Sequence, residues 1–301
     1  MTRGALAWLA LGACLLASPA RAQSLQRHVP AHPRAHAPAV LLVSGLGMGR
    51  EAWAFHGEGL APFLSSRGWD VFVLELPANA RFRDQVEVIL PAAVDTVQSL
   101  HAGRVVLGLH GHGGAVALAA CGHELLGRVA GVVGLDTPVE WELPNAVLGG
   151  VLAAGGRFGA LAGEEGRATL GLLFTHGAWL GSTVRERFAA EGLRDLSPAV
   201  ADEWLSALHA GAPPLPGPPF AERLARLDIP ILAVLGARDT VAHPEHVTPL
   251  RERAPRARVT FRELNRFQGA AEDYTHLSLL LGAGAPRDVF HPVAAWLERL
   301  P

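Results

Sequence analysis

Short apolar runs, several of them rich in β-branched residues, are spaced along the chain and separated by longer segments in which apolar and small residues recur at helical spacing. We expect strands at 39–44, 69–76, 104–109, 129–135, 229–235 and 258–264. The intervening segments predict helices at 51–67, 82–101, 114–126 and 289–300. Strands that alternate with helices of this length form a parallel sheet covered on both faces. The pattern therefore predicts an α/β fold with a doubly wound, mostly parallel sheet.

The stretch 138–228 departs from this alternation because it carries no convincing strand pattern. Its helical-looking segments are broken by glycine and proline, most clearly in the PPLPGPP run at 213–219. About ninety residues is long for one crossover between two strands. We therefore predict a helical cap at 138–228, inserted into a core made of 39–137 and 229–301.

Glycine turns follow two of the predicted strands. The segment 104–121, RVVLGLHGHGGAVALAAC, indicates a buried strand, a tight turn and a helix of small residues. A second glycine-rich loop, 45–49, follows the first strand. Parallel sheets bind ligands at the carboxyl ends of their strands. Both turns lie at such ends, so we expect a site there.

The turn in 104–121 resembles the nucleophile elbow of the α/β-hydrolase superfamily, which reads Gly-x-Ser-x-Gly. In that alignment His110 precedes the nucleophile position, Gly111 occupies it and His112 follows. Asp239, in Gly-Ala-Arg-Asp, is similar to the acid of the family, and His276 begins a His-Leu-x-Leu-Leu-Leu-Gly text similar to the acid-lipase and polyester-synthase-like branches. The resemblance runs from about residue 38 to the C-terminus and implies the chain order nucleophile position, acid, histidine.

The resemblance also implies an oxyanion hole, made by the backbone N–H groups of Leu46 and His112. It implies that the serine hydroxyl is missing, since Gly111 has no side chain. Glycine adopts the strained elbow conformation freely, so the turn survives this change and covalent catalysis does not. Asp136 stands where some members carry an alternative acid, but we favour a structural turn for it.

Three interpretations follow, and the sequence leaves them open. In the first, the protein binds an apolar small molecule, an ester-like ligand or a partner under its cap without serine-type turnover. In the second, it is a carboxylic-ester hydrolase of lipase or esterase type. Its His276–Asp239 pair would act on water or on a substrate proton, or with an unrecognised nucleophile such as Ser44 or Thr137.

The third interpretation is a metal-dependent hydrolase. His110, His112 and His276 would supply three imidazoles, enough for a zinc ion with one open position. Against it, the histidine before the nucleophile position usually points into the core. His243 and His246, three residues apart beside Pro244, are expected in a solvated loop.

The N-terminus predicts export. Residues 1–22 combine an early Arg3, an apolar run and the small-x-small site Ala20-Arg21-Ala22, which is typical of a secretory signal peptide. A secreted or periplasmic location follows. The alternative is a lipoprotein anchored at Cys14, within Leu-Gly-Ala-Cys. Residues 23–38 hold three prolines and are expected to be a linker.

Composition narrows the chemistry further. The formal net charge is −2, which gives no indication of a nucleic-acid partner. All basic residues are arginine, so lysine Schiff-base and pyridoxal-phosphate chemistry are excluded, and we expect no cofactor. After cleavage Cys121 is the single cysteine, so no internal disulfide can form. We expect no integral membrane span in the mature chain; the oligomeric state stays open.

Overall fold

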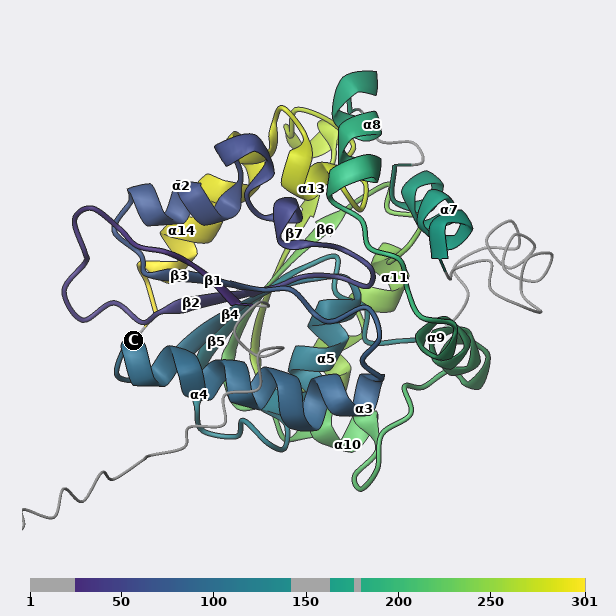
Figure 1. Cartoon of the computed structure of the whole chain (residues 1–301). Coiled ribbons are helices and arrows are strands. Elements are labelled where there is room, and N and C mark those ends of the chain that lie inside the picture. The colour runs from purple at the N-terminus through teal and green to yellow at the C-terminus, as the bar shows by residue number, and fades with distance from the viewer. Residues whose placement is uncertain (1–24, 142–162, 176–179, 301) are drawn as a thin grey trace, which may run out of the picture.

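A central sheet of seven strands organises the molecule, with β1 antiparallel and the other strands parallel (Figure 1). The computed structural model describes residues 25–141, 163–175 and 180–300. Along the sheet the strand order is β1-β3-β2-β4-β5-β6-β7. The strands are β1 (Leu25–His28), β2 (Val40–Val43), β3 (Val71–Leu74), β4 (Val105–His110), β5 (Val129–Leu135), β6 (Pro230–Gly236) and β7 (Arg258–Leu264).

The central strands are apolar throughout because both of their faces are buried. In β2, Val40 and Leu42 pack into one hydrophobic cluster, while Leu41 and Val43 pack into another on the opposite face. Successive side chains of a strand point to opposite faces, so one continuous apolar run supplies both layers. The doubly wound, mostly parallel α/β fold expected from the sequence is confirmed.

Helices cover both faces of this sheet. In Figure 1, α2 and α14 lie on one side and α4, α5 and α10 on the other. Their bounds are α2 (Leu60–Ser66), α3 (Phe82–Asp84), a π-helical turn η3 (Gln85–Ile89), α4 (Leu90–Leu100), α5 (His112–Cys121), α10 (Phe220–Ala225), α11 (Pro244–Val247), α12 (Leu250–Arg253), α13 (Ser278–Leu281), a π-helical turn η5 (Pro286–Phe290) and α14 (His291–Leu297). Short 3-10 turns lie at η1 (Arg50–Ala52), η2 (Phe55–Gly57) and η4 (Arg266–Gln268).

The helix expected at 51–67 is broken, and the backbone shows why. Only α2 is regular; η1 and η2 precede it. Gly57 and Gly59 have φ values of 83° and 127°, and His56 has a φ of 50°. Positive φ values are incompatible with a right-handed helix, so the apolar spacing continues across a break.

The linker predicted at 23–38 is wrong for residues 25–28. These residues form β1, which pairs antiparallel with β3, with Leu25 opposite Leu74 and His28 opposite Val71. The strand lies at the edge of the sheet and is partly exposed. A four-residue edge strand needs little apolar alternation, which explains why the pattern gave no signal. The predicted signal peptide at 1–22, with Cys14, lies outside the described residues.

The predicted cap contains helices α7 (Gly163–Thr175), α8 (Ser182–Glu191) and α9 (Pro198–Ala210). In Figure 1, α7 and α8 lie next to each other on one side of the sheet, and α9 lies apart from them on the same side of the picture. Within the parts of 138–228 that are described, no named strand occurs, as the sequence predicts. None of the helices in the described ranges combines the length and hydropathy that a membrane span requires.

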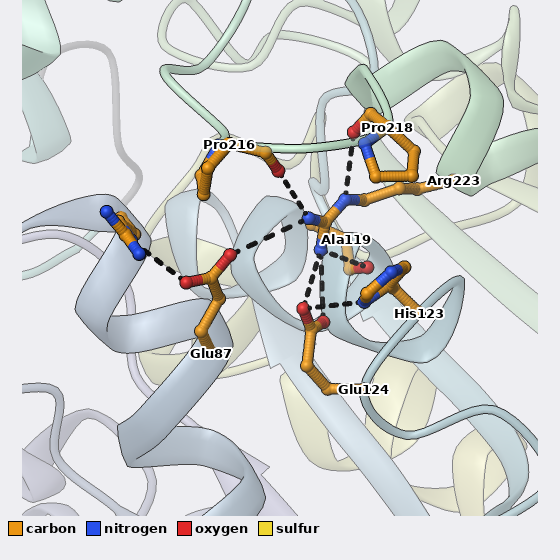
Figure 2. Close-up of polar contacts among 8 residues, drawn as sticks. Glu87, Ala119, His123, Glu124, Pro216, Pro218 and Arg223 are labelled. Atoms are coloured by element: carbon orange, nitrogen blue, oxygen red, sulfur yellow. Dashed lines mark hydrogen bonds and ion pairs between the residues drawn. The ribbon is translucent and has the colours of Figure 1, made fainter.

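The predicted cap returns to the core through the proline-rich run, which a buried arginine holds in place. Arg223, in α10, is fully buried and forms an ion pair with Glu124 at 3.0 Å. Figure 2 shows the same guanidinium donating to the carbonyls of Pro216 and Pro218. Arg223 also reaches the Ala119 carbonyl near the end of α5, where a cation opposes the negative end of the helix dipole.

Candidate functional site

The turn between β4 and α5 has the backbone of a tight strand-to-helix elbow. Gly111 is the residue before α5, with φ 51° and ψ −124°. The helix that follows can approach the sheet closely because two residues of its first turn, Gly113 and Gly114, are glycines. A β-carbon on Gly113 would collide with the Ser44 carbonyl, and one on Gly114 would collide with the Thr137 side chain. Small residues therefore bring this helix N-terminus to the carboxyl ends of the strands.

His276 and Asp239 form a buried pair beside this elbow. The Nδ1–H of His276 donates to Oδ2 of Asp239 at 2.6 Å. The other oxygen, Oδ1, accepts the N–H groups of Val241 and Ala242 at 2.6 and 2.9 Å. Burial alone would raise the pKa of Asp239, but the His276 ring and these hydrogen bonds hold that pKa well below its usual range. This hydrogen bond uses the Nδ1 side of the ring, and among the described residues Nε2 has no hydrogen-bond partner.

The His276 ring lies directly against Gly111. A β-carbon built on Gly111 would stand 2.9 Å from both Nε2 and Cε1 of this ring. The ring centroid lies 4.2 Å from that of His110 and 5.3 Å from that of Phe174 in α7. The structure thus brings Gly111, Asp239 and His276 together, as the motif spacing predicts.

The two residues expected to supply backbone donors line the same pocket. Leu46 lies in loop 45–49, and His112 is the first residue of α5. Among the described residues neither N–H has a hydrogen-bond acceptor. Two free N–H groups near a bare imidazole nitrogen would hold a carbonyl or carboxylate oxygen.

The side chain of His112 binds Gln85 and not His276. Its Nε2–H donates to Oε1 of Gln85 at 2.9 Å, and the Gln85 amide donates to the Ala80 carbonyl, which fixes the orientation of that amide. Burial lowers the pKa of His112 to about 4, so the ring is neutral.

Asp136 joins the pair, which the sequence did not lead us to favour. One oxygen each from Asp136 and Asp239 and a ring nitrogen of His276 lie within 4.8 Å of one another. Asp136 is fully buried with φ 44°, and its Oδ1 accepts the Gly236 N–H at 2.8 Å. Among the described residues its Oδ2 receives no N–H donor. Burial and the Asp239 charge raise the pKa of Asp136, and a proton on Asp136 can bond to the Asp239 carboxylate.

The three-histidine metal interpretation does not hold. His110 is fully buried, and its Nε2–H donates to the His276 carbonyl at 2.9 Å. The His112 ring binds Gln85 instead. Burial and the neighbouring His276 lower the pKa of His110 to about 3. Within the described residues the one group with metal-ligand spacing is Asp136, Asp239 and His276, whose Nδ1 already donates to Asp239.

The two alternative nucleophiles are not placed for attack. Ser44 is fully buried, and its hydroxyl donates to the Gly49 carbonyl at 3.3 Å. Thr137 is also buried, packed against Gly114. Neither side chain lines the pocket beside His276. Cys121 is buried in α5, where burial raises its thiol pKa to about 12, so it is an inert core residue.

The pocket at the site is small and mainly apolar, with about 50 Å³ of free volume, room for a few water molecules. Phe174 of α7 and Trp204 and Leu208 of α9 close it from the side of the predicted cap. Among its described lining residues there is no serine, threonine or cysteine. They are Leu46, Gly111, His112, Pro138, Glu140, Trp141, Phe174, Trp204, Leu208, Val241, Ala242, His246 and His276.

His246 corrects a second expectation. It was assigned to a solvated loop with His243, yet it is buried and lines this pocket, while His243 is partly exposed. Glu140, which forms an ion pair with Arg253 at 2.9 Å, lines the same pocket. Pro244, the first residue of α11, is visible in the sequence as a helix start. Only the packed fold turns His246 of this helix toward the pocket.

Solved structures with this arrangement of elements are numerous. A bromoperoxidase from Bacillus anthracis superimposes with a TM-score of 0.63 at 15% identity, covering 91% of this chain and 94% of the other. A monoacylglycerol lipase of Paleococcus ferrophilus gives 0.62 at 14%, covering 91% and 98%, and a thermophilic esterase from Thermogutta terrifontis gives 0.60 at 20%, covering 92% and 93%. No curated protein matches the sequence. The model of the alpha/beta hydrolase family matches residues 40–298.

Proposed function

The chain belongs to the alpha/beta hydrolase family, and from that membership we propose that it binds an apolar ester-like or carboxyl-bearing ligand without serine-type turnover. In this proposal Gly111 occupies the nucleophile position of the family elbow. The ligand would lie in the pocket beside His276, under the predicted cap. Its carboxyl or ester group would face the N–H groups of Leu46 and His112.

One observation carries the proposal: the described residues around the pocket offer no group for covalent catalysis of the serine or cysteine type. Gly111 has no side chain, and a β-carbon at this position would stand only 2.9 Å from the His276 ring. The family's ester chemistry requires a hydroxyl at this point to form an acyl intermediate. The rest of the site supports binding, since apolar walls surround two free N–H donors and one bare imidazole nitrogen.

Calorimetry and an esterase assay together test this proposal. We expect butyrate, whose short chain suits a pocket of this size, to bind the mature protein with an affinity that falls on Leu208→Trp, a substitution that fills the pocket. We also expect no hydrolysis of p-nitrophenyl butyrate or octanoate above the His276→Ala background. Steady-state turnover by the natural chain that disappears in His276→Ala would overturn the proposal.

A second candidate function is hydrolysis through water activated by the His276–Asp239 pair. The 2.6 Å hydrogen bond between them, with Nε2 bare and both N–H donors free, favours it. Water attack without an acyl intermediate would give linear product formation with no burst at high enzyme concentration. A burst, or transfer of the acyl group to an added alcohol, would exclude this candidate.

We also propose that the protein acts outside the cytoplasm, on the basis of the signal-like residues 1–22. N-terminal sequencing of protein recovered from the periplasm or medium should begin at Gln23. Mature protein that begins at a lipid-modified Cys14 would support the lipoprotein alternative instead.

A further inference from the structure

We propose that Arg194 of the predicted cap is a positioning residue for loop 45–49, and hence for the Leu46 N–H that faces the ligand. Arg194 lies outside the pocket and would touch no ligand. It acts by fastening three parts of the chain together: the cap segment 192–194, loop 45–49 and the end of β3. The inference rests on the proposed ligand-binding function for what Leu46 does, but not for how loop 45–49 is held.

Loop 45–49 is held largely from outside. Within it one backbone hydrogen bond occurs, from the Met48 N–H to the Gly45 carbonyl at 3.1 Å. Segment 192–194 supplies two further backbone hydrogen bonds. The Gly49 N–H donates to the Gly192 carbonyl at 2.8 Å, and the Arg194 N–H donates to the Gly47 carbonyl at 2.8 Å. Met48 and Leu193 thus form an antiparallel bridge between the two segments.

The Arg194 side chain locks this bridge onto the sheet. Its Nε and one Nη donate to the two oxygens of Glu75 at 2.8 and 3.0 Å, a bidentate pair directly after β3. The same Nη donates to Glu51 at 2.7 Å, just beyond loop 45–49. Glu75 in turn accepts the Arg50 N–H at 3.1 Å. These side chains are partly buried, so water screens the charges only in part.

Packing leaves loop 45–49 little freedom to take another path. A β-carbon on Gly47, where φ is 62°, would stand 2.9 Å from Cδ1 of Leu170 in α7. A β-carbon on Gly49 would collide with the Arg194 guanidinium and with Glu51. The backbone that follows Leu46 therefore lies in direct contact with the predicted cap at both Gly47 and Gly49. The direction of the Leu46 N–H then depends on where segment 192–194 sits.

The test measures hydrogen exchange and ligand discrimination on the mature chain. Arg194→Met removes the guanidinium and keeps most of the apolar stem. The matched control is Arg128→Met, because Arg128 is similarly exposed and also pairs with acidic and amide partners, Asp95 and Gln98, but lies away from loop 45–49. We expect a peptide spanning 44–49 to exchange about tenfold faster in Arg194→Met and unchanged in the control.

Butyrate and 1-butanol report on the Leu46 N–H, because they share a short alkyl chain and differ in the carboxylate. Arg194→Met should weaken butyrate binding about tenfold and leave butanol binding unchanged. Glu51→Gln, which weakens one contact and keeps the fold, should show a smaller change in the same direction. Exchange rates and a butyrate-to-butanol affinity ratio equal to those of Arg128→Met would overturn the inference. If the natural chain binds neither probe, the proposed function fails and hydrogen exchange alone decides the role of Arg194.

Discussion

The imidazole of His276 lies against the α-carbon of Gly111, so that a β-carbon there would stand 2.9 Å from Nε2. Real β-carbons do not approach a ring atom so closely. The His276 ring therefore lies too close to Gly111 for a side chain at this position to fit without a shift. The elbow is open to a side chain only if this ring moves away.

Gly111→Ser tests whether the His276 ring can move away from position 111. The backbone at Gly111 has a positive φ, so we expect the substitution to lower the free energy of unfolding by about 1–3 kcal/mol. If the His276 ring shifts, the new hydroxyl meets a bare Nε2, and hydrolysis of p-nitrophenyl butyrate should appear. Urea denaturation and initial rates measure the two effects.

Gly111→Ala is the control for this change. It carries the same β-carbon and the same backbone strain without a hydroxyl, so it should be destabilised equally and stay inactive. Activity in Gly111→Ala would mean that displacing the His276 ring, and not the hydroxyl, creates the hydrolysis.

Ser44 and Thr137 should not matter for any hydrolysis the natural chain shows. Both are buried outside the pocket, and the Ser44 hydroxyl is bound to the Gly49 carbonyl. We expect Ser44→Ala and Thr137→Val to keep the natural rate with p-nitrophenyl esters, while His276→Ala removes it. A loss of more than tenfold in either variant with unchanged thermal unfolding would restore that residue as a candidate nucleophile.

Asp136 should make stability fall with rising pH. Its folded-state pKa is raised by burial and by the Asp239 charge, so the folded protein holds this proton more tightly than the unfolded chain does. The contribution is fully present below the unfolded pKa of about 4 and is lost as the pH rises through the folded pKa. Relative to Asp136→Asn, the natural chain should lose about 1.4 kcal/mol per pH unit in that window.

Urea unfolding of both proteins at several pH values between 4 and 8 measures this difference. Asp95→Asn, at an exposed site, is the control and should run parallel to the natural chain. A constant difference between Asp136→Asn and the natural chain across this range would show that Asp136 is ionised in the folded protein.

Arg223→Met should destabilise the fold by about 3–5 kcal/mol. The change leaves Glu124 and the carbonyls of Pro216 and Pro218 without their donor in a buried place (Figure 2). Arg256→Met removes an exposed pair with Asp228 and should have a far smaller effect. Equal unfolding midpoints for the two variants would contradict a structural role for Arg223.

Strand prediction succeeded where both faces of a strand are buried. The segment 129–135 is β5 as expected, and β2, β3, β4 and β6 differ from their predicted ranges by a residue or two at their ends. The partly exposed edge strand β7 also matches its predicted range, 258–264, because apolar and polar residues alternate along it. A buried parallel strand leaves a dense apolar run, which local sequence reveals. The edge strand β1 leaves no such run, and the predicted helix at 51–67 is interrupted by backbone angles that apolar spacing does not encode.

The site could be predicted as far as motifs reach. The motif spacing predicts that three residues meet, Gly111, Asp239 and His276. Each follows the carboxyl end of a strand, and these ends lie on one side of the sheet. Asp136 and His246 could not be assigned with the same certainty. Their roles depend on which way a buried side chain turns, and residues distant in sequence, such as Gly236 for Asp136, decide that.

The bridge between Met48 and Leu193 also bears on how such proteins can be recombined. A cap from a relative, grafted between 138 and 228, would replace the partners of the Gly47 carbonyl and the Gly49 N–H. A working chimera must therefore keep segment 192–194, together with Glu51 and Glu75, from one parent. In this chain the insertion and the core are not interchangeable modules, because the junction that matters lies in the middle of the insertion and not at its ends.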